Sequence, residues 1–261
     1  MSERIYGIMS AMPEEIEGLE ILIEKLESFE IGKRKYYKGE INNVKVVVVF
    51  SRWGKVAAAT TATTLIVHFG VTNLIFTGVA GAINPKLNIG DIVIGTHLIQ
   101  HDMDASPLLP KFELPLLNLS IIESEEEEIN RATSAVQSLM DSNRLKTIIG
   151  EELLKNLEIS QPKLYAGFIA SGDKFIHLES DKNKLIAQIP SILCVDMESA
   201  AVAQVCYENT IPFVVIRTIS DKSDTNSSFD FQYFVKNIAN KYSFEIIKNM
   251  FESKEVIVEE I

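Results

Sequence analysis

Val-Ile-Arg-Thr-Ile-Ser-Asp, residues 215–221, is the end of an apolar run that stops in polar side chains. Two other stretches have the same form, Ser-Gly-Asp-Lys-Phe-Ile at 171–176 and Val-Asp-Met-Glu-Ser-Ala-Ala at 195–201. Short apolar runs of this kind are typical of strands buried on both faces of a sheet. The sequence therefore predicts buried strands over residues 164–170, 193–197 and 213–219.

Strand and helix signals alternate outward from these three strands. Further strands are predicted over residues 4–9, 36–41, 44–50, 73–77 and 91–99, with a hairpin turn at Asn42-Asn43. A helix is predicted to begin at Pro13, because apolar residues recur at helical spacing at Ile16, Leu19, Ile23 and Leu26. Other helices are predicted over residues 55–69, 124–140, 147–157, 181–189, 198–208 and 231–251.

The chain has no repeats, no low-complexity linker and no break in composition. Its 261 residues suit a single domain, which we place at 1–261. Alternating strands and helices predict an α/β fold, a three-layer αβα sandwich around a central mixed, mostly parallel sheet.

Charge and cysteine content exclude several classes of partner. With 25 Lys and Arg against 36 Asp and Glu, the net charge of −11 disfavours binding to nucleic acid or to an anionic membrane. Cys194 and Cys206 provide neither a disulfide framework nor the spacing of a zinc site, and His68 and His177 lack partners at ligand spacing. No apolar stretch approaches the roughly 20 residues that cross a bilayer, and the first residues do not read as a signal peptide. We therefore expect a cytoplasmic protein without metal or cofactor.

Ligands of open α/β sheets bind beyond the carboxyl ends of the strands. Six polar segments that follow predicted strands are therefore expected to meet at one rim, namely residues 10–15, 51–55, 78–81, 171–176, 196–198 and 217–221.

Three carboxyl groups in these segments could do chemistry, although each has an ordinary alternative explanation. Glu198 opens a helix, where nearby backbone N–H groups favour the ionised form, and it could accept hydrogen bonds from two adjacent hydroxyls. It could equally be a plain helix-start glutamate. Asp221 could be a turn or capping residue, and Glu15 a first-turn glutamate. His101-Asp102 could orient a loop of the site or form a plain turn.

The ordered motifs resemble the methylthioadenosine/S-adenosylhomocysteine nucleosidases, within the purine nucleoside phosphorylase/hydrolase superfamily. The resemblance runs from Ile5 to about Phe251. It is carried by Ile-Met-Ser-Ala-Met-Pro-Glu-Glu (8–15), Trp-Gly-Lys-Val-Ala-Ala-Ala (53–59), Thr-Gly-Val-Ala-Gly (77–81), Gly-Asp-Ile-Val (90–93), His-Asp-Met-Asp (101–104) and the three stretches quoted above.

The resemblance implies hydrolysis of the N-glycosidic bond of an adenine nucleoside by a set of named residues. Glu15 would activate water, Asp221 would protonate the leaving adenine, and Glu198 would bind the ribose hydroxyls. The other implied residues are Arg217 for placing the water, Met197 under the ribose, Ser220 orienting Asp221, Phe175 and the backbone of Ile176 at the purine, and Met12, Trp53, Ala105 and Phe231 around the 5′ group.

The chain departs from the family pattern at several positions. Val79, at the water-facing wall, stands where the family usually has serine, and Ala82 stands where it has glycine. Arg52 replaces a glycine and is expected to face solvent, with a reach toward the pocket as the alternative. Residues 106–163 match poorly, and the family's 5′ pocket borrows partner-subunit residues near this segment.

Two rival functions remain open on the sequence. A phosphate-dependent phosphorylase would need cations for phosphate, which only Arg52 and Arg217 could supply. A nucleoside-binding protein with little turnover would explain the loss of serine at position 79. The family, together with the apolar run at 108–119, also predicts a homodimer, although this run could instead cover the protein's own core.

Overall fold

A mixed β-sheet runs through the computed structural model, which describes residues 3–140 and 142–252. Its strands are β1 Ile5–Ser10, β2 Glu24–Ile31, β3 Arg34–Ile41, β4 Val44–Phe50, β5 Asn73–Ala82, β6 Ile92–Gln100, β7 Ile122–Glu123, β8 Leu164–Ser171, β9 Ile192–Asp196 and β10 Phe213–Asp221. The α-helices are α1 Pro13–Ile16, α2 Lys55–Phe69, α3 Glu126–Leu139, α4 Ser142–Ile149, α5 Glu151–Asn156, α6 Glu179–Gln188, α7 Ser199–Glu208, α8 Ser227–Phe234 and α9 Asn240–Phe251.

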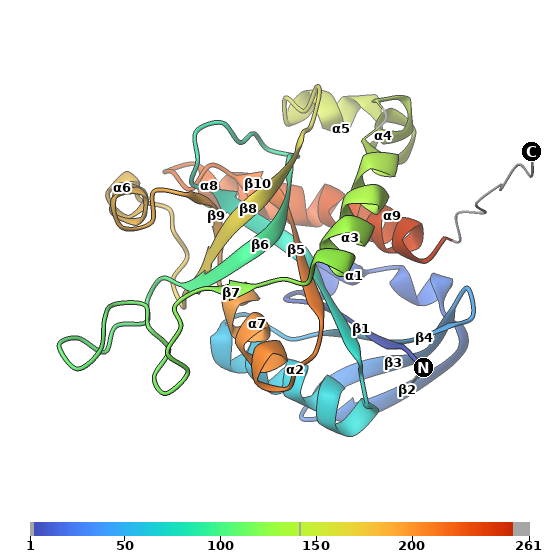
Figure 1. The fold of residues 1–261 in the computed structure, drawn as a ribbon. Helices are drawn as coiled ribbons and strands as arrows, with labels where there is room; N and C mark the ends of the chain where they lie inside the picture. The colour runs from blue at the N-terminus through green and yellow to red at the C-terminus, as the bar shows by residue number, and fades with distance from the viewer. Residues whose placement is uncertain (1–2, 141, 253–261) are drawn as a thin grey trace, which may run out of the picture.

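The sheet closes on itself around β5. Strand β5 pairs parallel with β10 and antiparallel with β9, while β10 pairs with β6 and β6 leads back through β8 to β9 (Figure 1). On its other side β5 pairs parallel with β1, which continues into the β4-β3-β2 meander. The predicted α/β fold with a mixed sheet is confirmed. Parallel pairs join the central strands, and antiparallel pairs form the meander and close the loop of strands.

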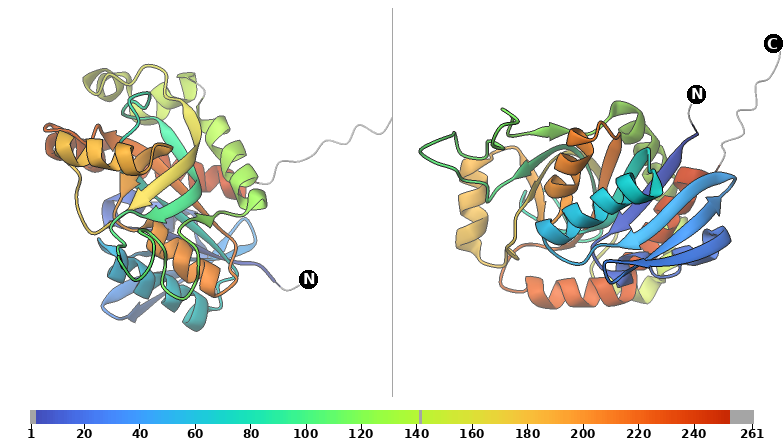
Figure 2. Two further views of the ribbon diagram at one scale, coloured as in Figure 1. Left: turned by 60° about the vertical axis from the view of Figure 1, so that its left-hand side comes forward. Right: turned by 90° about the horizontal axis from the view of Figure 1, so that it is seen from below.

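Helices cover both faces of the sheet, because successive strand residues point to opposite sides. Ile8 and Ile75 pack in a core with residues of α3 and α9, whereas their neighbours Met9 and Phe76 pack in a second core with residues of α2 and α7. Figure 2 shows α2 and α7 side by side on their face. Among the described residues, no helix is long and apolar enough to cross a membrane.

The predicted helix that begins at Pro13 and continues through Leu26 is wrong. Helix α1 ends at Ile16, Gly18 adopts a positive φ of 89°, and a single 3₁₀ turn, Leu19–Leu22, follows. The chain then enters β2, which pairs antiparallel with β3 at the edge of the sheet. Most β2 side chains are exposed, and the strand alternates apolar and polar residues only at its end, where Phe29 and Ile31 pack against the core.

The other predicted elements are present, most of them with shifted ends; the helix at 55–69 and the strand at 44–50 have the predicted ends. The helix predicted at 147–157 is interrupted at Gly150, whose φ is 96°, so α4 and α5 are separate. The C-terminal helix begins earlier, at Ser227, and contains a π-helical segment, Val235–Ala239, between α8 and α9. The short strand β7 was not predicted.

Candidate active site

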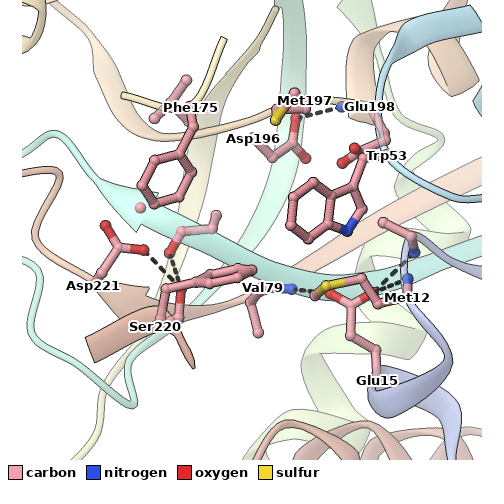
Figure 3. Close-up of a pocket in the computed structure, with 15 residues that line it drawn as sticks. Met12, Glu15, Trp53, Val79, Phe175, Asp196, Met197, Glu198, Ser220 and Asp221 are labelled. Atoms are coloured by element: carbon pink, nitrogen blue, oxygen red, sulfur yellow. Dashed lines mark hydrogen bonds between the residues drawn. The ribbon is translucent and has the colours of Figure 1, made fainter. Parts of the chain in front are cut away.

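The ends of β1, β5, β8, β9 and β10 surround one pocket, as the sequence predicts for the carboxyl rim of the sheet. Its lining residues are Ala11, Met12, Glu15, Trp53, Val79, Ala80, Gly81, Phe175, Val195, Asp196, Met197, Glu198, Ser220, Asp221 and Phe231. Three candidate carboxyl groups therefore share one cavity. Figure 3 shows Asp221 and Ser220 on one side, near Phe175, and Glu15 on the other side, near Met12.

Glu15 is held by three backbone donors at the base of the pocket. Its Oε2 accepts hydrogen bonds from the N–H groups of Ala11 (2.9 Å) and Met12 (2.8 Å), and its Oε1 accepts one from Val79 (2.9 Å). Burial nevertheless dominates and raises the pKa of Glu15. A raised pKa makes the carboxylate a stronger base, which favours its accepting a proton from water.

Arg217 lies behind Glu15, buried in the molecule. Its Nε donates to Asp196 Oδ2 at 2.7 Å and to Ser199 Oγ at 3.1 Å, and its guanidinium stacks on Phe76 at 4.0 Å. Among the described residues, Nη1 and Nη2 have no hydrogen-bond partner. Burial disfavours the charge, but nearby carboxyl groups, led by that of Asp196, outweigh burial and raise the pKa of Arg217.

Gly78 allows this packing of opposite charges. A Cβ atom at position 78 would overlap both Arg217 Nη1 and Glu15 Oε1. The cationic Nη1 therefore approaches the Glu15 carboxyl closely beside the β5 backbone. A molecule that gives up a proton to Glu15 would therefore also lie near the Arg217 guanidinium.

Glu198 is the N-cap residue of α7 and is almost fully buried. Its Oε1 accepts a hydrogen bond of 2.8 Å from the N–H of Gly54. Burial, followed by the charge of Asp196, raises the pKa of Glu198 to about 8, against the lowering effects of Arg217 and Gly54. The expectation that its helix-start position keeps it ionised does not hold, because desolvation exceeds the effect of nearby backbone donors.

Asp221 ends β10 on the opposite side of the pocket. Ser220 Oγ donates to its Oδ2 at 2.9 Å, and the Ser223 N–H donates to its Oδ1 at 2.9 Å. Burial raises the pKa of Asp221. A raised pKa favours the protonated carboxylic acid, which is the form that can donate a proton to a leaving base.

Aromatic and thioether side chains form the remaining walls. Phe231 contacts the Trp53 ring edge-to-face at a centroid distance of 6.1 Å and the Phe175 ring at 5.6 Å. Met12 and Met197 also line the cavity. Trp53 is 59% exposed, which places it at the mouth. The pocket therefore offers flat apolar surfaces beside the carboxyl groups of Glu15, Asp196, Glu198 and Asp221.

Most of the predicted site residues lie together. Ten line the pocket, and Arg217 lies directly behind it. Ala105 and Ile176 are not among the lining residues; Ile176 is buried in a separate apolar cluster. Arg52 is exposed and its Nη2 donates to Lys33 O at 2.6 Å, so the expectation that it faces away from the pocket is confirmed.

Asp196 belongs to a segment that was expected at the rim, but no role of its own was predicted for it. It lines the pocket and binds Arg217, yet only its position two residues before Glu198 at a strand end pointed to it. The roles of Ala11 and Gly54 were also not predicted, because these residues act through backbone N–H groups, which a side-chain pattern cannot indicate.

This fold and pocket define an α/β enzyme that acts on a small molecule by acid–base chemistry. The chain belongs to the Phosphorylase superfamily, whose family profile matches residues 5–252. It is 34% identical to the 5′-methylthioadenosine/S-adenosylhomocysteine nucleosidase of Staphylococcus carnosus (strain TM300), over 95% of this chain and 99% of that relative.

Two further proteins are similarly close. The aminodeoxyfutalosine nucleosidase of Campylobacter jejuni subsp. jejuni serotype O:2 is 35% identical, over 94% of this chain and 97% of the relative. The crystal structure of the 5′-methylthioadenosine/S-adenosylhomocysteine nucleosidase from Neisseria meningitidis in complex with methylthio-immucillin-A superimposes with a TM-score of 0.83 at 28% identity, covering 95% of this chain and 98% of that chain.

Proposed function

We propose that this protein is a nucleosidase that hydrolyses the N-glycosidic bond of methylthioadenosine and S-adenosylhomocysteine, releasing adenine. The observation that carries the proposal is the convergence of Glu15, Glu198 and Asp221 on one pocket. The named activities of the relatives support the same reaction.

We assign each end of the reaction to a different carboxyl group. Breaking the bond places positive charge on the ribose and negative charge on the departing adenine. Asp221 donates its proton to the adenine, while Glu15 accepts a proton from the attacking water, whose oxygen bonds to the anomeric carbon. Arg217 helps to place this water beside Glu15. The products are adenine and the 5′-thio-substituted ribose.

The substrate is held on both sides of the bond that breaks. Glu198 accepts hydrogen bonds from the ribose 2′ and 3′ hydroxyls, and Met197 packs under the sugar. Phe175 stacks on the purine, and the backbone of Ile176 binds its polar edge. Met12, Trp53 and Phe231 enclose the 5′ substituent, with Val79 on the wall near the water.

Phosphate is a poor nucleophile for this pocket. None of its lining residues is a lysine or arginine, and the Arg52 guanidinium is bound to the Lys33 carbonyl instead. The buried Glu15 carboxylate would also repel an anion in a medium of low dielectric constant. The structure therefore favours water over phosphate.

The test is adenine release from methylthioadenosine in phosphate-free buffer, followed by chromatography. We expect free methylthioribose and no effect of added phosphate. Turnover that requires phosphate and yields a ribose 1-phosphate product would replace this assignment by a phosphorylase. Binding without turnover would make the protein a nucleoside-binding protein. S-Adenosylhomocysteine and aminodeoxyfutalosine, the latter named in a relative, serve as comparison substrates.

We also propose that the protein is a cytoplasmic homodimer. Leu108 and Leu116 are 87% and 95% exposed in the segment that follows β6. Large apolar side chains that are left exposed in one segment favour an interface. Ala105, in the same segment, would then reach the 5′ subsite of the neighbouring subunit.

A further inference from the structure

A ring of polar contacts lies beside the pocket, between the start of α2 and the ends of β6 and β8. Lys55 Nζ donates to Asp102 Oδ1 at 2.6 Å and to Gln100 Oε1 at 3.1 Å. Asp102 Oδ2 accepts a hydrogen bond of 2.9 Å from the Asp173 N–H. Asp173 Oδ1 accepts one of 2.8 Å from the Lys55 N–H, which closes the ring.

The ring joins two loops that supply pocket residues. One loop contains Trp53 and Gly54, directly before Lys55, and the other leads from Asp173 to Phe175. Because the Lys55 ammonium and backbone N–H both take part, the ring fixes the peptide at which α2 begins. The Asp173 carboxylate also caps the positive end of this helix.

Gly54 connects the ring to the reaction site. Its N–H donates to Glu198 Oε1, and its φ of 93° turns the chain between that contact and Lys55. A Cβ at position 54 would lie 3.0 Å from Asp173 Oδ1, so the ring packs tightly against this turn. The direction of the Gly54 N–H therefore depends on the position of Lys55.

Around Asp102, the ring of polar contacts is also tightly packed. A Cβ at Gly172 would overlap the His101 ring and approach Asp102 Cγ to 3.0 Å. The Gly172 N–H donates to Asp196 O at 3.2 Å, and the His101 N–H donates to Ser171 O at 3.0 Å. Asp102 therefore sits on a turn that is bonded to the strand ends carrying the site.

We propose that Lys55 and Asp102 are positioning residues, which hold the Gly54 N–H on Glu198 and so orient that carboxyl group toward the ribose hydroxyls. This inference rests on the proposed function. Neither side chain lines the pocket, so each acts through Gly54 and Glu198. The Lys55–Asp102 pair is also shielded, with side-chain exposures of 18% and 32%, which strengthens its contact relative to a solvated pair.

The test compares methylthioadenosine with its 2′-deoxy analogue, which lacks one hydroxyl that Glu198 binds. We expect Asp102→Asn and Lys55→Met each to reduce kcat/KM for methylthioadenosine about tenfold, mainly through KM. The same variants should reduce kcat/KM for the 2′-deoxy analogue by less than about threefold, because less binding there depends on Glu198. In a Glu198→Gln background, adding Asp102→Asn should have little further effect.

Lys25→Met is the matched control, because Lys25 forms an ion pair of the same kind with Glu40, 2.7 Å long and on the exposed edge of the sheet. This variant should leave kcat/KM unchanged for both methylthioadenosine and its 2′-deoxy analogue. Equal losses on the two substrates, or additive losses with Glu198→Gln, would overturn the proposal and leave the ring a general structural feature. Thermal melting curves identify any variant that fails to fold. If either Asp102→Asn or Lys55→Met does so, the kinetics of the other variant test the proposal.

The proposed function can fail separately. If the wild-type protein releases no adenine from either nucleoside, the hydrolysis is wrong. Calorimetric affinities of the same two nucleosides for the wild type and for Asp102→Asn then test the ring alone. A loss of affinity confined to methylthioadenosine supports it, and equal affinities overturn it.

Discussion

Asp221 and Glu15 are both buried carboxyl groups, but different neighbours surround them. Glu15 faces Arg217 and three backbone N–H donors, which favour its charged form, whereas Asp221 is hydrogen-bonded by Ser220 and Ser223 and lies near the acidic Asp230, which favours its protonated form. Two carboxyl groups in such different surroundings are suited to opposite roles, one as base and one as acid.

Asp221→Asn should lower kcat by a factor of about 10² to 10⁴, the range for loss of a general acid. KM for methylthioadenosine should change little, because the proton is needed only as the bond breaks. Steady-state kinetics measure both parameters. Ser220→Ala, which removes one hydrogen bond to Asp221, should cost far less. A near-normal kcat for Asp221→Asn would exclude Asp221 as the proton donor.

The pH dependence of kcat/KM should reflect Glu198. Its carboxyl group faces Asp196, Glu15, Arg217 and the Gly54 N–H, and its pKa is raised to about 8. Only the ionised form accepts hydrogen bonds from two hydroxyls. As pH falls below about 8, Glu198 takes up a proton, so kcat/KM should fall. Glu198→Gln should have a lower kcat/KM that no longer falls with pH in this range. If the same fall persists in that variant, it must reflect the titration of another group.

Val79→Ser tests the departure from the family pattern at the water-facing wall. The Val79 N–H already binds Glu15, so a hydroxyl there would lie beside the base. A hydroxyl that helps to hold water contributes about 1 kcal/mol, so kcat should rise several-fold while KM stays nearly constant. Val79→Ala removes volume without adding a hydroxyl and should not raise kcat. A decrease with serine would mean that the water is placed by other groups.

At the scale of elements, the Arg217–Asp196 ion pair ties β10 to β9, with side-chain exposures of 1% and 2%. Removing one partner of a buried pair leaves the other charge unpaired, which typically costs about 3–5 kcal/mol of unfolding free energy. Arg217→Met should therefore lower stability in urea unfolding, and adding Asp196→Asn should restore part of it. If Asp196→Asn restores nothing, the loss comes from packing on Phe76.

Sequence patterns predicted elements well where burial controls them. The helix at 55–69 has the predicted ends, and the strands at β8, β9 and β10 follow their apolar runs closely. Strand β2 was missed because edge pairing with β3 stabilises a mostly polar segment, in which only Phe29 and Ile31 at its end alternate with polar residues. The sequence also did not predict that the sheet closes through the pairing of β5 with β9, because these strands are far apart along the chain.

In the candidate site, too, the sequence predicted what depends on buried strands and missed what depends on loop conformation and long-range contacts. Motif side chains such as Phe175 and Met197 line one pocket, since they follow strands whose ends converge. Contributions from backbone donors, such as Gly54, could not be predicted, because they depend on loop conformation. The raised pKa of Glu198 also required the folded structure, since burial decides it.

At the scale of the whole molecule, the segment after β6 projects from one side of the body, with Leu108 and Leu116 exposed (Figure 1). We expect light scattering at micromolar concentration to give about twice the chain mass of 29.2 kDa. Replacing both leucines by glutamate should give a monomer, because burying two carboxylates at an apolar interface is unfavourable.

The same double variant should lower kcat/KM for methylthioadenosine if Ala105 of one subunit completes the 5′ subsite of the other. Most of the loss should vanish with adenosine, whose 5′ hydroxyl makes less apolar contact. Ile21→Glu is the control, because Ile21 is 80% exposed on the 3₁₀ turn and should change neither mass nor activity. A wild-type protein that is monomeric and fully active at micromolar concentration would contradict the dimer. A monomeric double variant with unchanged kinetics would instead show that each pocket is complete within one chain.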